Sequence, residues 1–512
     1  MDVPSLMRQA VEFNRESIAI VTSERTLTYG EAWDRGIRVA HALIDAGIEP
    51  GDRVGMVEDN HLAAVDLILG AAIAGAVRVP LYARNSRLAH RAMIESTETK
   101  LVFADEAYAA SVEGFDAEIG CLTRVLVRDD GYEDWLRAFD GADPMIEVRP
   151  EDWYIIRHSS GTSGRPKGVG YRQHDWVANC RNWFYRLPRL ERDSVFGHAA
   201  PISHASGYLF LPTWLAGATN LLYGRFEPRS VLEQTERHRV THTFLAPSMV
   251  AALCAEPSSR ERDWTSLECI LTGGAPITDA TINASREVFG DVLHQVFGQT
   301  EATPLTLLTP QEWFADVPGS TPMRSAGKVL PFCRLEIRDE LGRCVAPGTE
   351  GEIYAQIEAQ MSGYWRDPER SAERLVDGWV RTGDIGRVDA NGYLYVLDRV
   401  DDMIVSGAFN IWPSELETVI ADLPGVIEVA VFAIPHEKWG ETPMAVCHVD
   451  AGCSLTSDDV IAYVAERMGS YLKPTRVEFV HEDLPKTVVG KILRRRLREP
   501  YWQGQEARVH GA

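Results

Sequence analysis

The stretch Ser159-Ser160-Gly161-Thr162-Ser163-Gly164-Arg165-Pro166-Lys167-Gly168-Val169 has the composition of a phosphate-binding loop. It follows the apolar run 153–156, which the pattern predicts to be a buried strand. Glycines let backbone N–H groups approach an anion, the hydroxyls add donors, and Lys167 adds a mobile positive charge. The kinase and GTPase loop G-x-x-x-x-G-K-[ST] is not matched, because Gly168 follows Lys167 where a Ser or Thr would hold magnesium. The expected phosphate-binding residues are Ser159, Ser160, Gly161, Thr162, Ser163, Gly164 and Lys167.

Length and charge restrict the classes of protein that the chain can belong to. With 512 residues it is too long for one compact core, so we expect two or more domains. A composition of 45% hydrophobic and 25% charged residues is typical of a globular protein. The net charge of −22 argues against nucleic acid or an anionic membrane as the main partner. An anionic substrate must therefore be received by local positive charge.

The cysteines and the N-terminal residues indicate in which cellular compartment the protein is expected. The eight cysteines form no C-x-x-C pair and no zinc-like spacing, so reduced thiols in a cytoplasmic protein are expected. Residues 1–16 carry acids and no long apolar run, so no secretion signal is predicted. The longest apolar stretch, at 67–77, is too short to span a bilayer. We expect a monomer or homodimer with no membrane span.

The chain before the glycine-rich stretch alternates predicted strands with predicted helices. Strands are expected at 18–21, 53–57, 101–104 and 123–127, and amphipathic helices around 29–46 and 62–76. Thr28 followed by Glu31 predicts a capping box at the start of the first of these helices. This rhythm predicts an α/β fold of doubly wound, largely parallel sheets.

Three further motifs follow. His204 lies in Pro201-Ile202-Ser203-His204-Ala205-Ser206-Gly207, ahead of an apolar run at 208–215. A predicted strand at 269–272 leads into Gly273-Gly274-Ala275, where paired glycines let a flat ligand lie close to the backbone. Phe297-Gly298-Gln299-Thr300-Glu301 follows another apolar run, and a hydroxyl beside a carboxylate suits a magnesium triphosphate.

The pattern of predicted elements changes in the last third of the chain. Short alternating strands at 334–397, with the turn signal Asn391-Gly392, predict a small β-barrel or sheet. Asp384 precedes that hairpin, and a carboxylate is a good acceptor for a cis-diol. The acid-rich stretch 398–402 is expected to be an exposed linker, compatible with a hinge. A small α+β unit follows, and it ends in a glycine, Lys491 and the basic run 494–498. The arginines of that run are either a solvated helix face or a phosphate-binding surface.

Taken in order, these motifs resemble those of the acyl-adenylate-forming superfamily, which includes acyl-CoA synthetases and aryl-CoA ligases. The resemblance covers nearly the whole chain and implies an ATP-dependent acid–thiol ligase that uses Mg²⁺ and CoA. It implies an N-terminal domain at 1–398 and a mobile C-terminal domain at 399–512, hinged at 399–402 with Asp401 as the pivot.

The resemblance also implies a role for each motif. Lys491 is the catalytic lysine, Thr300 contacts the α-phosphate, Glu301 holds Mg²⁺, and His204 positions the substrate. Asp384 and Arg399 bind the ribose, and Gly407 lines a tunnel for pantetheine. The segments Gly273-Gly274-Ala275 and Phe297-Gly298-Gln299 lie against the nucleotide and the acyl group.

Two alternatives remain open at this point. One is a stand-alone adenylation enzyme that loads an acyl carrier protein, and the other is a non-catalytic nucleotide-binding protein. The second is disfavoured because Lys491, Glu301 and Asp384 are all present. An amino-acid substrate is disfavoured because 202–211 holds no acid. The mostly apolar expected lining favours a small neutral acid that is aromatic, alicyclic or of medium chain length; its residues are His204, Tyr208, Ala246, Gly273, Gly274, Phe297 and Thr303.

Overall fold

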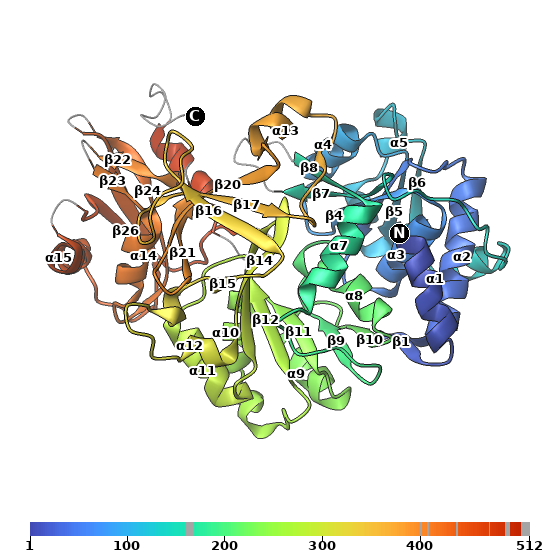
Figure 1. Ribbon diagram of the computed structural model, residues 1–512, viewed down its shortest axis with the longest axis horizontal. Helices are drawn as coiled ribbons and strands as arrows, with labels where there is room; N and C mark the ends of the chain where they lie inside the picture. Colours follow the sequence, from blue (N-terminus) through green and yellow to red (C-terminus); the bar gives the residue numbers. More distant parts are fainter. Residues whose placement is uncertain are drawn as a thin grey trace. The chain divides into compact units, whose positions relative to one another are not determined.

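The computed structural model describes residues 1–159, 167–399, 402–406, 409–436, 439–469, 472–486 and 492–502 (Figure 1). The chain forms two compact units. The first comprises Met1–Leu335 with Ala355–Val380, and the second comprises Glu336–Tyr354 with Arg381–Ala512. The sequence-based boundary at 398 stays a prediction, because the units are defined by packing and not by motion.

The larger sheet of the first unit has nine strands in the order β15-β14-β13-β12-β11-β9-β10-β1-β2. Its central pairs are parallel, while β2, β14 and β15 are antiparallel at the two edges. The carboxyl ends of β11 to β13 therefore meet at one edge, where ligands bind in open α/β sheets. The strands are β1 Ile18–Val21, β2 Thr26–Thr28, β9 Val195–His198, β10 Thr219–Leu222, β11 His242–Leu245, β12 Cys269–Gly273, β13 Leu293–Gln299, β14 Ala302–Leu308 and β15 Lys328–Val329.

The second sheet of this unit has seven strands in the order β18-β8-β7-β4-β3-β5-β6. The pairs from β7 to β6 are parallel, and β8 and β18 add an antiparallel edge. That edge carries the glycine-rich stretch between β7 and β8. The strands are β3 Arg53–Glu58, β4 Val77–Tyr82, β5 Leu101–Asp105, β6 Arg124–Arg128, β7 Trp153–Ser159, β8 Lys167–Arg172 and β18 Gly363–Tyr364.

Helices pack against these sheets, and α7 contacts strands of both (Figure 1). Every residue of α3 is buried, so the prediction of an amphipathic helix around 62–76 is wrong in that respect, because a helix that is apolar all round has no solvent-facing side. The predicted capping box is confirmed, with both halves formed between Thr28 and Glu31. The helices are α1 Val3–Asn14, α2 Tyr29–Asp45, α3 Leu62–Ile73, α4 Arg87–Thr97, α5 Phe115–Glu118, α6 Tyr132–Arg137, α7 Gln173–Trp183, α8 Phe210–Leu215, α9 Pro228–Arg237, α10 Pro247–Ala255, α11 Asp279–Phe289, α12 Pro310–Trp313 and α13 Pro368–Arg374.

A third sheet has five strands, and three of them cross from one unit to the other along the chain. Its path is β16-β17-β20-β19, with β21 beside β20. The predicted hairpin is formed by β20 and β21, and Gly392 takes a positive φ of 83° in its turn. The strands are β16 Cys333–Arg338, β17 Gly351–Ile357, β19 Leu375–Val376, β20 Trp379–Val388 and β21 Leu394–Arg399.

The rest of the second unit is an α+β assembly with its own apolar core. Its sheet follows the path β23-β22-β25-β24, and β26 pairs with β25. The fold class predicted from the sequence is confirmed, with large doubly wound sheets followed by a smaller α+β part. The elements are β22 Ile404–Ser406, β23 Phe409–Ile411, β24 Val426–His436, β25 Gly440–Val449, β26 Arg476–Val480, α14 Pro413–Ala421, α15 Ser457–Met468 and α16 Arg494–Arg498.

Two general expectations can be compared with the structure. All eight cysteines are free thiols, as predicted. Within the described ranges, no helix combines the length and the apolar character needed to cross a membrane.

Candidate active site

The glycine-rich stretch sits between two paired strands. Ser159 at the end of β7 pairs with Lys167 at the start of β8, so the two ends of the connection are fixed side by side. The intervening predicted residues Ser160, Gly161, Thr162, Ser163 and Gly164 lie outside the described residues, as does the side chain of Ser159. Lys167 is half-buried at the base of the loop.

A tyrosine links Lys167 with the predicted metal ligand Glu301. Tyr364 on β18 pairs with Val169 on β8, which brings its ring next to Lys167. The Lys167 Nζ atom lies 5.7 Å from the centroid of the Tyr364 ring, within reach of a cation–π attraction. The Tyr364 hydroxyl donates a hydrogen bond of 2.8 Å to Oε1 of Glu301, whose side chain is buried. Burial, and then the charge of Glu301, raises the pKa of Tyr364 well above its usual value, so the phenol stays a donor.

Thr300 occupies the tight turn between β13 and β14, where Gln299 pairs with Ala302. Its carbonyl oxygen accepts hydrogen bonds from the hydroxyls of Tyr171, at 2.5 Å, and Tyr208, at 3.4 Å. The backbone of the turn is thereby fixed, and Thr300 and Glu301 are presented from a rigid position. A buried carboxylate with one oxygen bound by a phenol keeps further lone pairs for a hard cation, so Glu301 fits a magnesium ligand.

His204 begins a short turn that an arginine holds in place. Arg157 Nη2 donates to the carbonyl of Ser203 at 3.0 Å and also to the carbonyl of His204. The guanidinium carbon of Arg157 lies 4.2 Å from the centroid of the Tyr208 ring. Burial, and then the charge of Arg157, lowers the pKa of His204 to about 4, so its imidazole is neutral at pH 7. A neutral ring suits substrate positioning, the role predicted for it.

The predicted segment Gly273-Gly274-Ala275 follows the end of β12. Gly273 pairs with Val296 on β13, and a Cβ atom at Gly273 would lie only 2.5 Å from the Val296 carbonyl oxygen. Gly274 has a φ of 81°, which glycine adopts without strain. On β13, a Cβ atom at Gly298 would lie 2.5 Å from Oγ1 of Thr303. Glycine is thus required where these two strands end, next to Phe297 and Gln299.

The second unit holds the two residues predicted to bind ribose. Asp384 on β20 pairs directly with Arg399 on β21, and Arg399 Nε lies 3.1 Å from Asp384 Oδ1. The backbone N–H of Asp384 donates to Oγ1 of Thr382, whose hydroxyl donates to the carbonyl of Ile353. The structure therefore brings Asp384 and Arg399 together on one hairpin, and their roles stay predictions.

The prediction that residues 398–402 form an exposed linker is wrong at Asp398. Asp398 is buried and forms an ion pair with Arg494, which also contacts Asp402 and Glu417. Burial raises the pKa of Asp398 to about 6. Arg494 is thus neither a solvated residue nor a surface phosphate ligand, because three carboxylates enclose its guanidinium. Asp401, Gly407 and Lys491 lie outside the described residues.

Sequence reasoning missed three side chains of this site. Tyr364, Tyr171 and Arg157 contact the predicted residues from strands β18, β8 and β7, and none of the three was predicted from the sequence. Only the pairing of β18 with β8, across almost 200 positions of sequence, places Tyr364 beside Glu301. Arg157 offered one local signal, since a cation in an otherwise apolar strand demands buried partners.

A lysine that directly follows a glycine-rich sequence and is linked through a tyrosine to a buried carboxylate is the arrangement expected of a nucleotide-binding enzyme. The chain belongs to the AMP-binding enzyme family. The sequence model of that family matches residues 6–365, and the model of its C-terminal domain matches residues 415–491.

Named relatives agree with this assignment. The chain is 36% identical over 481 residues to a feruloyl-CoA synthase of Amycolatopsis sp, covering 93% of this chain and 94% of the relative. It is 31% identical to the fatty acid–[acyl-carrier-protein] ligase ScoC of Streptomyces coeruleorubidus, covering 96% and 94%. The structure is similar to that of the amide bond synthetase McbA from Marinactinospora thermotolerans, with a TM-score of 0.87, 29% identity and coverage of 98% and 100%.

These comparisons confirm the predicted superfamily, the ligase class and the use of ATP and CoA with a carboxylic acid. The predicted Mg²⁺ is typical of the family. The reaction is the formation of an acyl-adenylate from an acid and ATP, followed by transfer of the acyl group to CoA.

Proposed function

We propose that the acid activated by this ligase is a neutral aromatic, alicyclic or medium-chain carboxylic acid. The observation that carries this proposal is the neutral His204 beside the aromatic ring of Tyr82. The Tyr82 and His204 ring centroids are 5.4 Å apart. His204 is uncharged near pH 7, so it would offer no opposite charge to a second carboxylate or an ammonium group on the acid.

For the first half-reaction, we assign each residue a physical task. A carboxylate oxygen of the acid attacks the α-phosphorus of ATP, and the bond from that phosphorus to the leaving pyrophosphate breaks. Two like unit charges 4 Å apart repel each other by roughly 4 kcal/mol at an effective dielectric near 20, so cations must offset the approach. Lys491 lies between the carboxylate and the α-phosphate in this proposal, and Lys167 with its loop receives the leaving phosphates.

The remaining assignments follow the same chemistry. Thr300 donates to an α-phosphate oxygen, and the position of its backbone under Tyr171 supports that role. Glu301 holds Mg²⁺, which when bound neutralises charge on the triphosphate. Asp384 and Arg399 bind the ribose hydroxyls.

In the second half-reaction the thiol of CoA attacks the acyl carbonyl and AMP leaves with the electrons of the broken C–O bond. We propose that the C-terminal part rotates about Asp401 between the two steps, withdrawing Lys491 and presenting Gly407 to the pantetheine arm. Glycine leaves room for a slender chain.

The substrate proposal is tested by ATP–pyrophosphate exchange over a panel of acids. The panel contains hydroxycinnamic acids, because a feruloyl-CoA synthase is a close relative in sequence, together with benzoic, alicyclic, medium-chain, dicarboxylic and amino acids. Preference for a dicarboxylic or amino acid would refute the proposal. Repeating the reaction with CoA, a carrier protein and an amine separates the three acceptors that the relatives' names suggest.

The role of Lys491 is tested by Lys491→Ala. This change should abolish pyrophosphate exchange and leave thioester formation from supplied acyl-AMP largely intact. Equal loss in the two assays would refute the assignment. The predicted cytoplasmic location and the monomeric or dimeric state stay predictions.

A further inference from the structure

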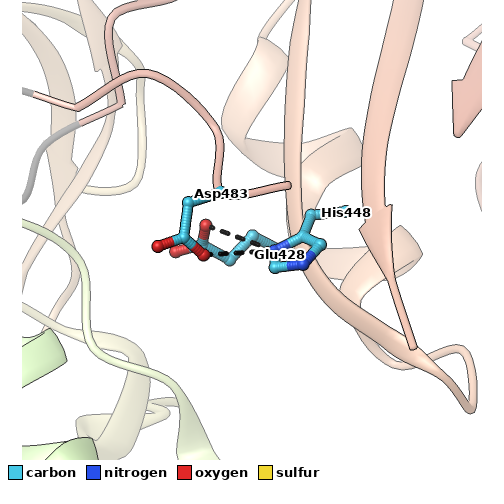
Figure 2. Close-up of side chains that lie close together, drawn as sticks. All are labelled: Glu428, His448 and Asp483. Carbon is cyan, nitrogen blue, oxygen red and sulfur yellow. Dashed lines mark ion pairs between the residues drawn. The ribbon is translucent and has the colours of Figure 1, made fainter. Parts of the chain in front are cut away.

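Three side chains of the second unit that the reaction does not use converge at the edge of its sheet (Figure 2). Glu428 on β24 and His448 on β25 stand directly opposite one another in the antiparallel pair. Asp483 follows β26 and points at the same place (Figure 2). One ligand atom from each residue lies within 4.8 Å of the other two.

Two atoms of this cluster are buried without a hydrogen bond. His448 is 9% exposed, and its Nδ1 has no hydrogen-bond partner within the part of the chain that the structure describes. The same holds for Oε2 of Glu428. Buried polar atoms are normally paired, so an imidazole nitrogen and a carboxylate oxygen that face each other unpaired point to a missing ligand.

The distances favour a cation over a direct ion pair. Nδ1 of His448 lies 3.9 Å from Oε2 of Glu428 and 3.6 Å from Oδ1 of Asp483. A protonated imidazole bound to a carboxylate would stand at about 2.7–2.9 Å. Two ligands of a tetrahedral zinc ion, each about 2.0–2.1 Å from the metal, are about 3.4 Å apart. The observed spacing is closer to the second case and needs only a small inward shift.

The segment that carries Asp483 is fixed in position. The next residue, Leu484, is buried in an apolar cluster with Phe432 and Met444. The backbone N–H of Leu493 donates to the carbonyl of Pro485 at 2.7 Å. A cation would therefore meet three ligands held by paired strands and by an anchored segment, even though the Asp483 carboxylate itself is exposed.

A lysine competes for the same carboxylate. Lys486 Nζ lies 2.6 Å from Oε1 of Glu428 and leaves Oε2 to face His448. Its charge opposes a second cation, so removing it should strengthen metal binding. A substitution of Lys486 should therefore raise the affinity for the metal, whereas substitutions of the ligands should lower it.

We propose that Glu428, His448 and Asp483 bind one divalent transition-metal ion of the Zn²⁺ type, with water completing the coordination. Imidazole nitrogen with carboxylate oxygens suits Zn²⁺ or Co²⁺, whereas Mg²⁺ prefers an all-oxygen octahedron. The site is distinct from the Mg²⁺ of the nucleotide. Because Asp483 lies in the segment that leads to Lys491, a bound ion would tie the base of that segment to β24 and β25.

The test uses the full-length, untagged enzyme after removal of metal by a chelator. Zn²⁺ binding is measured by calorimetry in excess Mg²⁺, and Co²⁺ binding by its visible absorption. We expect one ion per chain. His448→Phe should weaken binding at least as much as the roughly 10- to 100-fold cost of losing an outer-shell partner. Lys486→Met should tighten it, and His481→Ala, which removes a neighbouring imidazole, should leave it unchanged.

Two results would overturn the site. One is Zn²⁺ binding that His481→Ala abolishes and His448→Phe preserves, which would mean binding by a surface histidine only. The other is the absence of binding in both the wild type and Lys486→Met. If circular dichroism shows that His448→Phe is unfolded, the test depends on Lys486→Met. Unchanged or weaker metal binding in Lys486→Met would contradict the proposed competition and overturn the site.

Discussion

Tyr364→Phe tests whether the contact between Tyr364 and Glu301 serves the nucleotide. The change removes one hydroxyl that donates at 2.8 Å to a buried carboxylate and leaves the ring beside Lys167. A hydrogen bond to a charged group contributes about 1.5–3 kcal/mol. If that contribution is realised when MgATP binds, kcat/KM for MgATP falls about 10- to 150-fold. The enzyme should also need a higher Mg²⁺ concentration, because Glu301 is no longer held in one orientation.

The assay is ATP–pyrophosphate exchange with MgATP and free Mg²⁺ varied separately. Tyr132→Phe is the matched control, because the Tyr132 hydroxyl donates at 3.2 Å to the buried Asp66, a carboxylate that Arg35 also binds. Both variants should lose some stability in thermal unfolding, but only Tyr364→Phe should change the nucleotide kinetics. A Tyr364→Phe enzyme with kcat/KM and Mg²⁺ dependence equal to those of Tyr132→Phe would refute the reasoning.

Three further predictions concern stability. Desolvation lowers the pKa values of four histidines to about 4, of which three are buried and one is half-buried; the buried ones are His198, His242 and His294, and the half-buried one is His204. The unfolded chain therefore binds protons below pH 6.5 that the folded chain does not bind, and the free energy of unfolding should fall from pH 7 to pH 5 by up to about 2 kcal/mol per histidine. An unchanged free energy of unfolding in urea titrations would contradict their desolvation. Arg494→Met leaves three carboxylates facing one another and should destabilise the second unit by about 3–5 kcal/mol in calorimetry, whereas Arg495→Met, which affects an exposed pair with Glu499, should cost under about 1 kcal/mol. Gly273→Ala places a Cβ atom 2.5 Å from the Val296 carbonyl and should cost about 1–3 kcal/mol together with exchange activity, while Gly120→Ala, with open space around it, should change neither.

Features specified by neighbouring residues could be predicted from the sequence. The capping box at Thr28 and Glu31 and the turn at Asn391-Gly392 depend on spacings of a few positions, and both form as predicted. The order of the motifs identified the family, and the alternation of strands and helices indicated the doubly wound sheets. For the candidate site, this reasoning selected Glu301, which the structure buries, and His204, whose ring is neutral at pH 7; the roles assigned to them stay predictions.

Features that depend on distant pairing could not be predicted in the same way. Asp398 looked solvated because its neighbours are acidic, yet Arg494, 96 positions away, pairs with it in a buried cluster. Tyr364 gave no sign of its contact with Glu301, because that contact exists only once β18 has paired with β8. Long-range ion pairs and strand pairings are set by the packing of the whole fold, which no local pattern encodes.

The strands β16, β17 and β20, each of which begins in one compact unit and ends in the other, limit how this gene can be divided. Residues Glu336–Tyr354 belong to the second unit although first-unit segments flank them on both sides. Expression of 399–512 alone would therefore produce a fragment that lacks part of its own unit, and the same cut would leave 336–354 and 381–398 attached to the wrong half. Exchange of the C-terminal part with a relative then requires compatible residues at all three strand crossings, and not at a single junction.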